Sequence, residues 1–235
     1  MEEMEETVKS AAALLCISKA AALGDLCFSY ILEHVKAGVS EKAIAAKIEA
    51  FLAENGSEGM AFPVICVSGE RTNLPHGEPS DKLIEKGDFV TLDFGAIIGG
   101  CCGDMTRTVA VGRVTEEQRR VYSAVLSAQR AALAAARPGA RCADVDKAAR
   151  DVIENAGYGE YYVHGTGHGV GAKVHEPPTL NAASRQILEE DTPVTIEPGV
   201  YIPGRFGARI EDLIIIAKFG AVNLVRSAKE LIILP

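Results

Sequence analysis

Four carboxylates and one histidine stand in short segments whose other residues are nearly all apolar or small. They are Asp93 in VTLDFG, Asp104 in CCGDMTRT, His168 in HGTGHGVG, Glu197 in TIEPGV and Glu211 in ARIEDL. A carboxylate inside an apolar strand costs several kcal/mol unless a cation or a hydrogen-bonded network compensates it. The summed charge of about −4 would balance two divalent cations, and oxygen-rich ligation suits hard or borderline metals. The sequence therefore predicts a site for two metal ions.

The spacing of these residues fits ligands that come from several strands. Asp93 and Asp104 are eleven residues apart with glycines between them, as across a hairpin, and Glu197 and Glu211 are fourteen apart with three glycines between. Glycines also surround His168, where they would let the backbone approach a metal closely. Two metals about 3.5–4 Å apart can share one hydroxide and bind a substrate carbonyl or amine. The chemistry predicted from this pattern is metal-assisted hydrolysis.

Each of these residues taken singly has an ordinary structural explanation. Asp104 could pair with Arg107, Glu211 could pair with Arg209, and the other three could be turn or strand-end residues. Five independent coincidences of this kind in one chain are improbable, so we prefer the joint interpretation as metal ligands.

The elements that must position these residues can be predicted from hydrophobic periodicity and helix-end signals. Hydrophobic residues make up 48% of the 235 positions, enough to bury a sizeable core. Helices are predicted at about 5–36, 40–55, 115–136 and 143–155, with Ser40 and the Thr115–Gln118 pair as N-terminal caps. Strand-like runs lie at 61–69, 88–98 and 106–112, and then at 161–163, 193–196, 209–216 and 230–234.

The two halves of the chain can be overlaid. Residues 36–56 match residues 137–157 at an offset of 101, and near this offset Asp93 falls opposite Glu197 and Asp104 opposite Glu211. A duplication that places acids at equivalent points implies a site on a pseudo-twofold axis. We therefore predict one compact α+β unit with halves at about 1–114 and 115–235.

Composition narrows the partners and the compartment. The formal net charge of −8 argues against nucleic-acid or anionic-membrane partners. The chain has no run of 18 consecutive apolar residues, and the acidic start MEEMEETVKS lacks the basic region of a signal peptide. Six cysteines without C-x-x-C spacing are typical of reduced thiols. These features predict a cytoplasmic protein without a membrane segment.

The motifs, in this order, resemble those of the pita-bread metallopeptidases, which include methionine aminopeptidases, Xaa-Pro aminopeptidases and Xaa-Pro dipeptidases (prolidases). The resemblance runs over residues 61–235. It implies the pita-bread fold, a curved antiparallel sheet enclosed by two pseudo-twofold-related α/β halves. It also implies a dimetal centre in which Asp93 binds one metal, His168 binds the other, and Asp104 and Glu211 bridge them. Glu197 is the fifth ligand and would also transfer a proton.

Three further histidines resemble substrate-side residues of this family. His76 in NLPHGEPSDK matches the histidine at the site rim, which orients substrate. His164 matches the one that meets the P1′ side, and His175 in VHEPP matches the one that hydrogen-bonds the scissile carbonyl or the leaving nitrogen. Four of the chain's five histidines lie in these motifs. The fifth, His34, is expected on the first helix without a catalytic role.

Two features resemble the Xaa-Pro branch of the family. Arg209 stands two residues before Glu211, and TIEPGVYIPG carries Tyr201. By this resemblance Arg209, Tyr201 and Asp93 form a network that orients a metal ligand. The implied activity is hydrolysis of the N-terminal Xaa-Pro bond of dipeptides or short peptides by a metal-activated hydroxide. Methionine aminopeptidase is the first alternative, and a non-catalytic scaffold and a metal-free creatinase-like hydrolase are weaker ones.

Two departures from the Xaa-Pro branch leave part of this assignment open. Members of the branch usually carry an N-terminal domain that caps the site, whereas this chain begins at the catalytic domain, so dipeptide restriction and a homodimer stay open. The loop IIGGCCGD replaces an aromatic-containing loop, which predicts a softer substrate-side wall at Ile98, Cys101 and Cys102. By resemblance the metals are Mn²⁺, with Co²⁺, Zn²⁺ and Fe²⁺ as alternatives.

Overall fold

The structure is a computed structural model that describes residues 7–235, so the predicted helix start at residue 5 lies outside the described residues. The helices are α1 (Ala11–Leu32), α2 (Glu41–Glu54), α3 (Glu116–Ala135) and α4 (Cys142–Asn155), with short 3-10 turns η1 (Gly69–Asn73) and η2 (Gly159–Tyr161). The strands of the first half are β1 (Ile65–Ser68), β2 (Phe89–Phe94), β3 (Ile97–Ile98), β4 (Cys101–Cys102) and β5 (Met105–Val111). The later strands are β6 (Gly167–Gly169), β7 (Glu176–Leu180), β8 (Pro193–Ile196), β9 (Gly199–Ile202), β10 (Phe206–Arg209), β11 (Asp212–Ala217), β12 (Gly220–Asn223) and β13 (Ile233–Leu234).

The helix starts follow the predicted caps. The Ser40 hydroxyl accepts a hydrogen bond from the Ala43 amide at 3.2 Å, and Thr115 and Gln118 form the reciprocal capping box. The first helix begins later than predicted, at Ala11, because Ser10 caps it by accepting from the Ala13 amide. The four predicted helices are therefore confirmed, but the first is shorter than predicted and ends at Leu32 instead of near residue 36.

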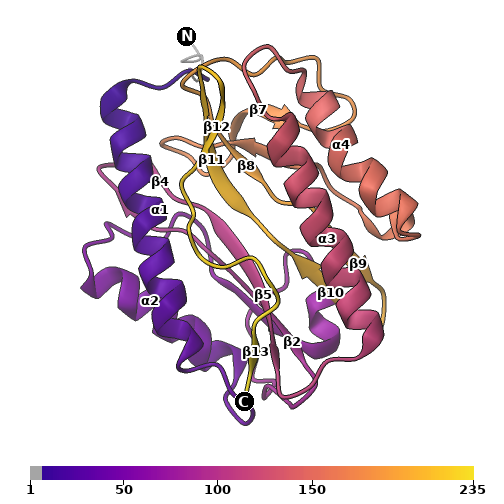
Figure 1. Ribbon diagram of the computed structural model, residues 1–235. Coiled ribbons are helices and arrows are strands. Elements are labelled where there is room, and N and C mark those ends of the chain that lie inside the picture. The colour runs from indigo at the N-terminus through magenta and orange to yellow at the C-terminus, as the bar shows by residue number, and fades with distance from the viewer. Residues whose placement is uncertain (1–6) are drawn as a thin grey trace.

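The two halves repeat one plan, which confirms the predicted α+β fold with antiparallel sheets. In the first half β2 lies antiparallel between β1 and β5, and in the second β8 lies antiparallel between β6 and β11. A helix pair precedes each strand set: α1 and α2 lie on the left of the strands in Figure 1, and α3 and α4 on the right. The halves meet where the Glu211 amide donates to the Thr106 carbonyl at 3.0 Å.

Some strand predictions were wrong. The run 161–163 is not a strand, since η2 ends at Tyr161 and a loop follows. The prediction missed β4, β6, β7, β9, β12 and most of β10. β6 is Gly-His-Gly and β7 contains two prolines, so pairing with neighbours rather than intrinsic propensity stabilises them. The predicted strand 209–216 is interrupted, because β10 pairs with β9 while β11 pairs with β8. This interruption places Glu211 at the junction of the two strand pairs.

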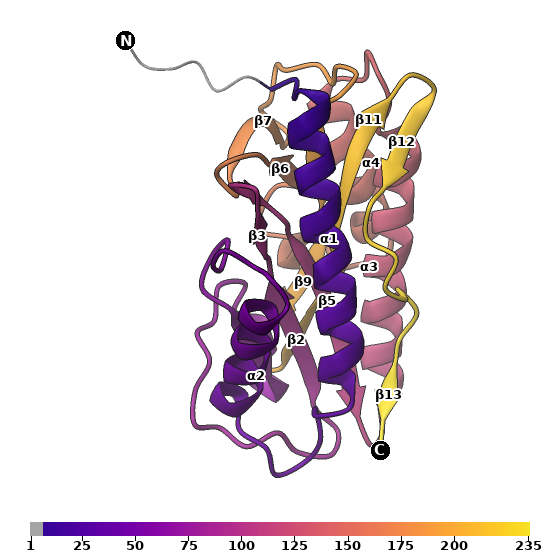
Figure 2. The same ribbon diagram turned by 90° about the vertical axis from the view of Figure 1, so that its left-hand side faces the viewer.

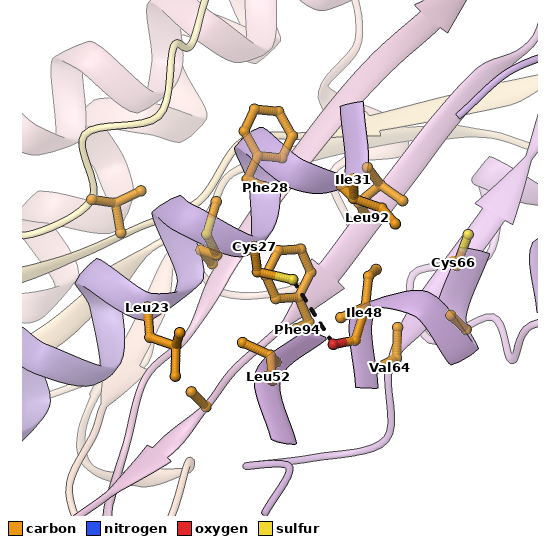
Figure 3. Packing of buried hydrophobic residues seen from close by; sticks show 14 of the residues in the cluster. Leu23, Cys27, Phe28, Ile31, Ile48, Leu52, Val64, Cys66, Leu92 and Phe94 are labelled. Carbon is orange, nitrogen blue, oxygen red and sulfur yellow. Dashed lines mark hydrogen bonds between the residues drawn. The ribbon is translucent and has the colours of Figure 1, made fainter. Parts of the chain in front are cut away.

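The core of the first half packs α1 and α2 against the sheet. Figure 3 shows Leu23, Cys27 and Ile31 of α1 facing Ile48 and Leu52 of α2. By length and composition alone α1 passes a test for membrane-crossing helices, a test that a core helix of a globular protein also passes. Its buried face is part of this core. Burying one such aliphatic side chain stabilises the fold by about 1.5–3 kcal/mol, so this face of α1 contributes substantially to folding.

The C-terminal segment ties the helices of the two halves together. It runs between α1 and α3 in Figure 1 and borders α1 again in Figure 2. Asp25 of α1 accepts hydrogen bonds from the Arg226 and Ser227 amides at 2.8 Å, and the Tyr122 hydroxyl of α3 donates to the Lys229 carbonyl at 2.8 Å. β13 then pairs in parallel with β5.

Candidate metal centre

The strands bring the five predicted ligands to one place. Asp93 is in β2 and Asp104 immediately precedes β5; Glu197 immediately follows β8 and Glu211 immediately precedes β11. The acids thus occupy matching positions in the two halves, as the overlay predicted. His168 is the central residue of β6.

Glycines on either side of His168 allow β6 to approach its neighbours. A Cβ at Gly167 would collide with the Thr195 carbonyl, and one at Gly169 with the Pro177 carbonyl. These glycines therefore serve the close packing of strands, and not, as expected from the sequence, an approach of backbone to metal.

The side chains converge on one cavity of about 720 Å³, and all five candidate ligands line it. His168 Nε2 lies 3.3 Å from Glu197 Oε1 and 3.7 Å from Asp104 Oδ2. Ligand atoms of Asp104, His168 and Glu211 all lie within 4.8 Å of one another. The cavity thus gathers four carboxylates and an imidazole within the reach of small cations.

The proton positions on His168 favour a cation at its second nitrogen. Nδ1 faces the Gly169 carbonyl oxygen at 3.1 Å, so Nδ1 carries a proton and donates it. Nε2 then faces two carboxylates, and a lone pair there would repel their oxygens. A proton or a metal ion between Nε2 and the carboxylates removes this repulsion, which is the arrangement expected of a metal-binding histidine.

Burial and mutual repulsion make the acid cluster costly without cations. Two like charges about 4 Å apart repel by about 4 kcal/mol at an effective dielectric constant of about 20. Burial, together with the charges of Glu211 and other neighbouring acids, raises the pKa of Asp104 well above its usual range. Burial and the charges of Glu197 and Asp93 do the same to the pKa of Glu211. The donor set and its excess negative charge therefore fit divalent cations.

His168 and Glu197 behave as a proton-sharing pair. Burial disfavours the charged form of each, but their mutual hydrogen bond and attraction outweigh it. The pKa of His168 is raised, and that of Glu197 is lowered to about 2. A proton on His168 therefore occupies a position that a cation can take over.

These shifts predict that metal binding releases protons. Asp104, Glu211 and His168 hold protons more tightly than usual in the metal-free protein, and a metal must displace them. We expect Mn²⁺ binding near pH 6.5 to release about one to three protons, and fewer at pH 9. Calorimetry in buffers of different ionisation enthalpy measures this number. Metal uptake at pH 6.5 with no proton release would contradict it.

Only one of the two carboxylate oxygens of Asp93 has a hydrogen-bond partner among the described residues. Its Oδ2 accepts from Arg209 Nη2 at 2.6 Å, whereas its buried Oδ1 has no hydrogen-bond partner among the described residues. Burial raises the pKa of Asp93 and the Arg209 charge opposes that shift. A buried carboxylate oxygen without a donor is costly, and a cation would satisfy it.

A network of side chains lies behind the ligands. Arg209 donates to the Tyr201 hydroxyl at 2.7 Å and to Thr106 Oγ1 at 3.1 Å, and Thr106 donates to Glu211 at 2.5 Å. Arg209 thus links Asp93 and, through Thr106, Glu211. The two ion pairs weighed from the sequence, Asp104 with Arg107 and Glu211 with Arg209, do not form.

The remaining predicted histidines also reach the cavity. His76, His164 and His175 line it, and the His175 and His168 rings lie 4.4 Å apart between centroids. His164 donates from Nδ1 to the Gly165 carbonyl at 2.7 Å, so its Nε2 accepts from the Tyr201 hydroxyl at 2.8 Å. Burial lowers the pKa of both His164 and His175, which favours neutral rings at pH 7.

Other expectations about the site need correction. His34 lies just beyond the end of α1, where its Nδ1 contacts the Tyr30 carbonyl at 3.0 Å. The loop residues Ile98, Cys101 and Cys102 do not line the cavity, so they do not form its substrate-side wall.

Sequence reasoning missed two threonines that support the ligands. Thr106 joins Arg209 to Glu211, and Thr195 Oγ1 accepts from the His168 amide at 3.1 Å and lies 3.3 Å from Glu197. Both stand in ordinary strand patterns that carry no signal of this role.

The model of metallopeptidase family M24 matches residues 15–218. The chain is 41% identical over 225 residues to a Xaa-Pro dipeptidase of Pyrococcus furiosus, covering 96% of this chain and 65% of that protein. It is similar to the solved Xaa-Pro dipeptidase from Bacillus anthracis (TM-score 0.96, 43% identity, 97% of this chain and 64% of that one). It is also similar to the X-Pro aminopeptidase from Thermotoga maritima (TM-score 0.94, 37% identity, 97% and 65%).

The chain spans less than two thirds of the length of these relatives. Within that span the match is nearly continuous, and the family model covers most of the chain. The chain therefore belongs to metallopeptidase family M24, and membership implies that it binds divalent metal.

Proposed function

We propose that this chain is the catalytic part of a two-metal exopeptidase that hydrolyses the N-terminal Xaa-Pro bond of short peptides. The observation that carries the proposal is the convergence of four carboxylates and a histidine on a cavity that three more histidines line. The activities named for the relatives from Pyrococcus furiosus, Bacillus anthracis and Thermotoga maritima support it.

The metal-binding residues in this proposal are Asp93, Asp104, His168, Glu197 and Glu211. Bound divalent cations would lower the pKa of water and polarise the scissile carbonyl. His175, neutral at pH 7, is placed to donate a hydrogen bond to the carbonyl oxygen as it gains charge. Glu197, which lies 3.3 Å from His168 Nε2 inside the cavity, is proposed to transfer a proton to the leaving nitrogen in addition to binding metal.

Part of the cavity lining suits proline. The lining includes Phe62, Pro63, Val174 and Pro177, which offer apolar surface to a pyrrolidine ring. An Xaa-Pro bond also lacks an N–H, so the site needs no acceptor for one. His164 and His76 border the same cavity and are proposed to orient the peptide.

Further parts of the proposal concern the cellular context. The proposed metal is Mn²⁺, the compartment is the cytoplasm, in which the six free cysteines would stay reduced, and the oligomer is a homodimer. Residues 1–235 are proposed to form one catalytic domain. Two core clusters, each of which contains residues of both halves, and the Thr106–Glu211 junction support this.

Hydrolysis of matched peptides by the Mn²⁺-reloaded chain tests the function. The set is Ala-Pro, Ala-Pro-Ala, Met-Pro and Met-Ala-Ser. We expect cleavage of the proline peptides only, because the apolar wall accepts a pyrrolidine ring, and Ala-Pro against Ala-Pro-Ala separates dipeptidase from aminopeptidase. Cleavage of Met-Ala-Ser alone would instead indicate a methionine aminopeptidase. Absence of turnover with two metals bound would refute the activity for this chain.

A further inference from the structure

Three fully buried carboxylates outside the five candidate ligands take no part in the proposed chemistry: Glu41, Asp146 and Asp212, the last of which pairs with Arg107 and Lys229. Glu41 is the first residue of α2 and Asp146 lies in the second turn of α4, so each belongs to the second helix of its half. They are not equivalent by duplication, because Asp146 overlays Ala45, one helical turn from Glu41. Buried acids persist only when their partners satisfy them, so those partners indicate their role.

Glu41 accepts five hydrogen bonds, and they close a loop. Oε1 accepts from the Ser68 amide at 2.7 Å and from its hydroxyl at 2.9 Å. Oε2 accepts from Arg71 Nε at 3.0 Å, from the Ser80 amide at 3.0 Å and from the Ser80 hydroxyl at 2.7 Å. Arg71 also donates to the Glu78 carbonyl at 2.6 Å. Both ends of the segment 71–80, which carries His76, are thus bound to one carboxylate.

Asp146 makes the corresponding contacts in the second half. Oδ1 accepts from the Thr166 amide at 3.1 Å and from its hydroxyl at 2.9 Å, and Arg150 forms a two-point pair with both carboxylate oxygens at 2.9–3.0 Å. Arg150 in turn donates to the carbonyls of Tyr162 at 3.1 Å and His164 at 2.9 Å. The Thr166 carbonyl accepts from the Glu197 amide at 2.8 Å, so this cluster also reaches a candidate ligand.

The two clusters share one construction. In each, a buried acid accepts the amide and the hydroxyl of a Ser or Thr and binds an arginine, and the arginine donates to carbonyls of a loop with a cavity histidine. We propose that Glu41 and Asp146 are positioning residues that, through Arg71 and Arg150, hold the loops of His76 and His164 at the cavity. The catalytic consequence rests on the proposed peptidase function.

Arg71 and Arg150 are the residues to replace in a test. Their side chains are 33% and 31% exposed, so replacing them perturbs the core far less than replacing the buried acids. Arg71→Gln and Arg150→Gln each remove the contacts to loop carbonyls. Arg141→Gln is the matched control, because the one side-chain partner of Arg141 among residues 7–235 is exposed Asp144 at the start of α4.

Hydrogen exchange of the metal-loaded chain is the first measurement. Arg71→Gln is expected to speed exchange about tenfold within residues 71–80 and to leave residues 162–166 unchanged, and Arg150→Gln is expected to do the reverse. The histidine ring signals in NMR spectra should move in the same pattern, His76 in one variant and His164 in the other. The control should change neither loop.

Peptide kinetics complete the test. Each loop variant is expected to lose about tenfold in kcat/KM on Ala-Pro-Ala with unchanged metal content, which corresponds to about 1.4 kcal/mol in transition-state stabilisation. Equal exchange in both loops, or no loop change in either variant, overturns the positioning role. If the wild-type chain cleaves no peptide, the proposed function fails, while the exchange pattern still decides whether these residues hold the loops.

Discussion

Asp104→Asn is expected to abolish peptide hydrolysis and, in the same molecule, to stabilise the metal-free fold. The two effects have opposite signs because the Asp104 carboxylate is favourable beside bound cations and unfavourable without them. As a ligand it balances metal charge, and we expect its loss to lower kcat/KM by about 10³-fold or more. Without metal it is a buried acid whose pKa burial and Glu211 raise, so neutralising it removes an unfavourable charge.

The stabilising effect should grow with pH. An acid whose folded-state pKa is raised stabilises the fold fully below its unfolded value, about 4, and that contribution is lost as the pH rises through the folded-state pKa. At pH 8 the metal-free wild type has lost this stabilising contribution of Asp104, whereas the Asn variant has no ionisable group at this position and its stability does not change in this way. We expect the Tm of the metal-free variant to exceed that of wild type by about 2–8 °C at pH 8, and by less at pH 5.

Thermal unfolding in chelator, and again with Mn²⁺, provides the measurement. Asp81→Asn is the control, since Asp81 is strongly exposed and its one ion-pair partner in the described part of the chain is exposed Lys42. That variant should shift Tm by less than about 1 °C in either condition. A metal-free Asp104→Asn variant that melts below wild type at pH 8 would show that the acid cluster is not under repulsion.

The five candidate ligands could be selected from the sequence because the chemistry that makes such residues conspicuous is local. An acid in an apolar run is conspicuous wherever the chain folds, and five such positions agree on one explanation. Two helix starts were equally predictable, since the capping residues Ser40 and Thr115 lie within three residues of the amides that they cap. The side chains that contact the candidate ligands could not be predicted in this way.

Contacts between distant segments could not be predicted. Arg209 was a candidate partner of Glu211, two residues along the chain, yet its Nη2 donates to Asp93, 116 positions away. Arg107 likewise pairs with Asp212 at 2.7 Å rather than with Asp104. Choosing between a near and a far partner requires the strand register, and the sequence pattern does not determine that register for strands as irregular as β6.

Arg209→Lys is expected to lower kcat/KM at least about 100-fold although the positive charge is kept. The guanidinium donates simultaneously to Asp93, Tyr201, Thr106 and the Pro75 carbonyl. A lysine ammonium is a single point charge and cannot span these acceptors, so Asp93 and Thr106 lose their fixed orientation. Thr106 donates to Glu211, so one substitution disturbs a ligand in each half of the molecule.

Kinetics and metal content, measured together, separate the consequences of this substitution. Arg205→Lys is the matched control, because Arg205 pairs with Glu117 on the surface, and we expect less than a twofold change. If Arg209→Lys binds two metals yet loses kcat, the arginine acts by orienting the ligands Asp93 and Glu211. If the variant loses one metal, the guanidinium group of Arg209 is needed for metal binding. If kcat/KM of Arg209→Lys equals that of wild type, the backbone of β2 and of the junction at Glu211 orients the Asp93 and Glu211 carboxylates without help from the arginine. The buried Arg209 network would then be dispensable for catalysis.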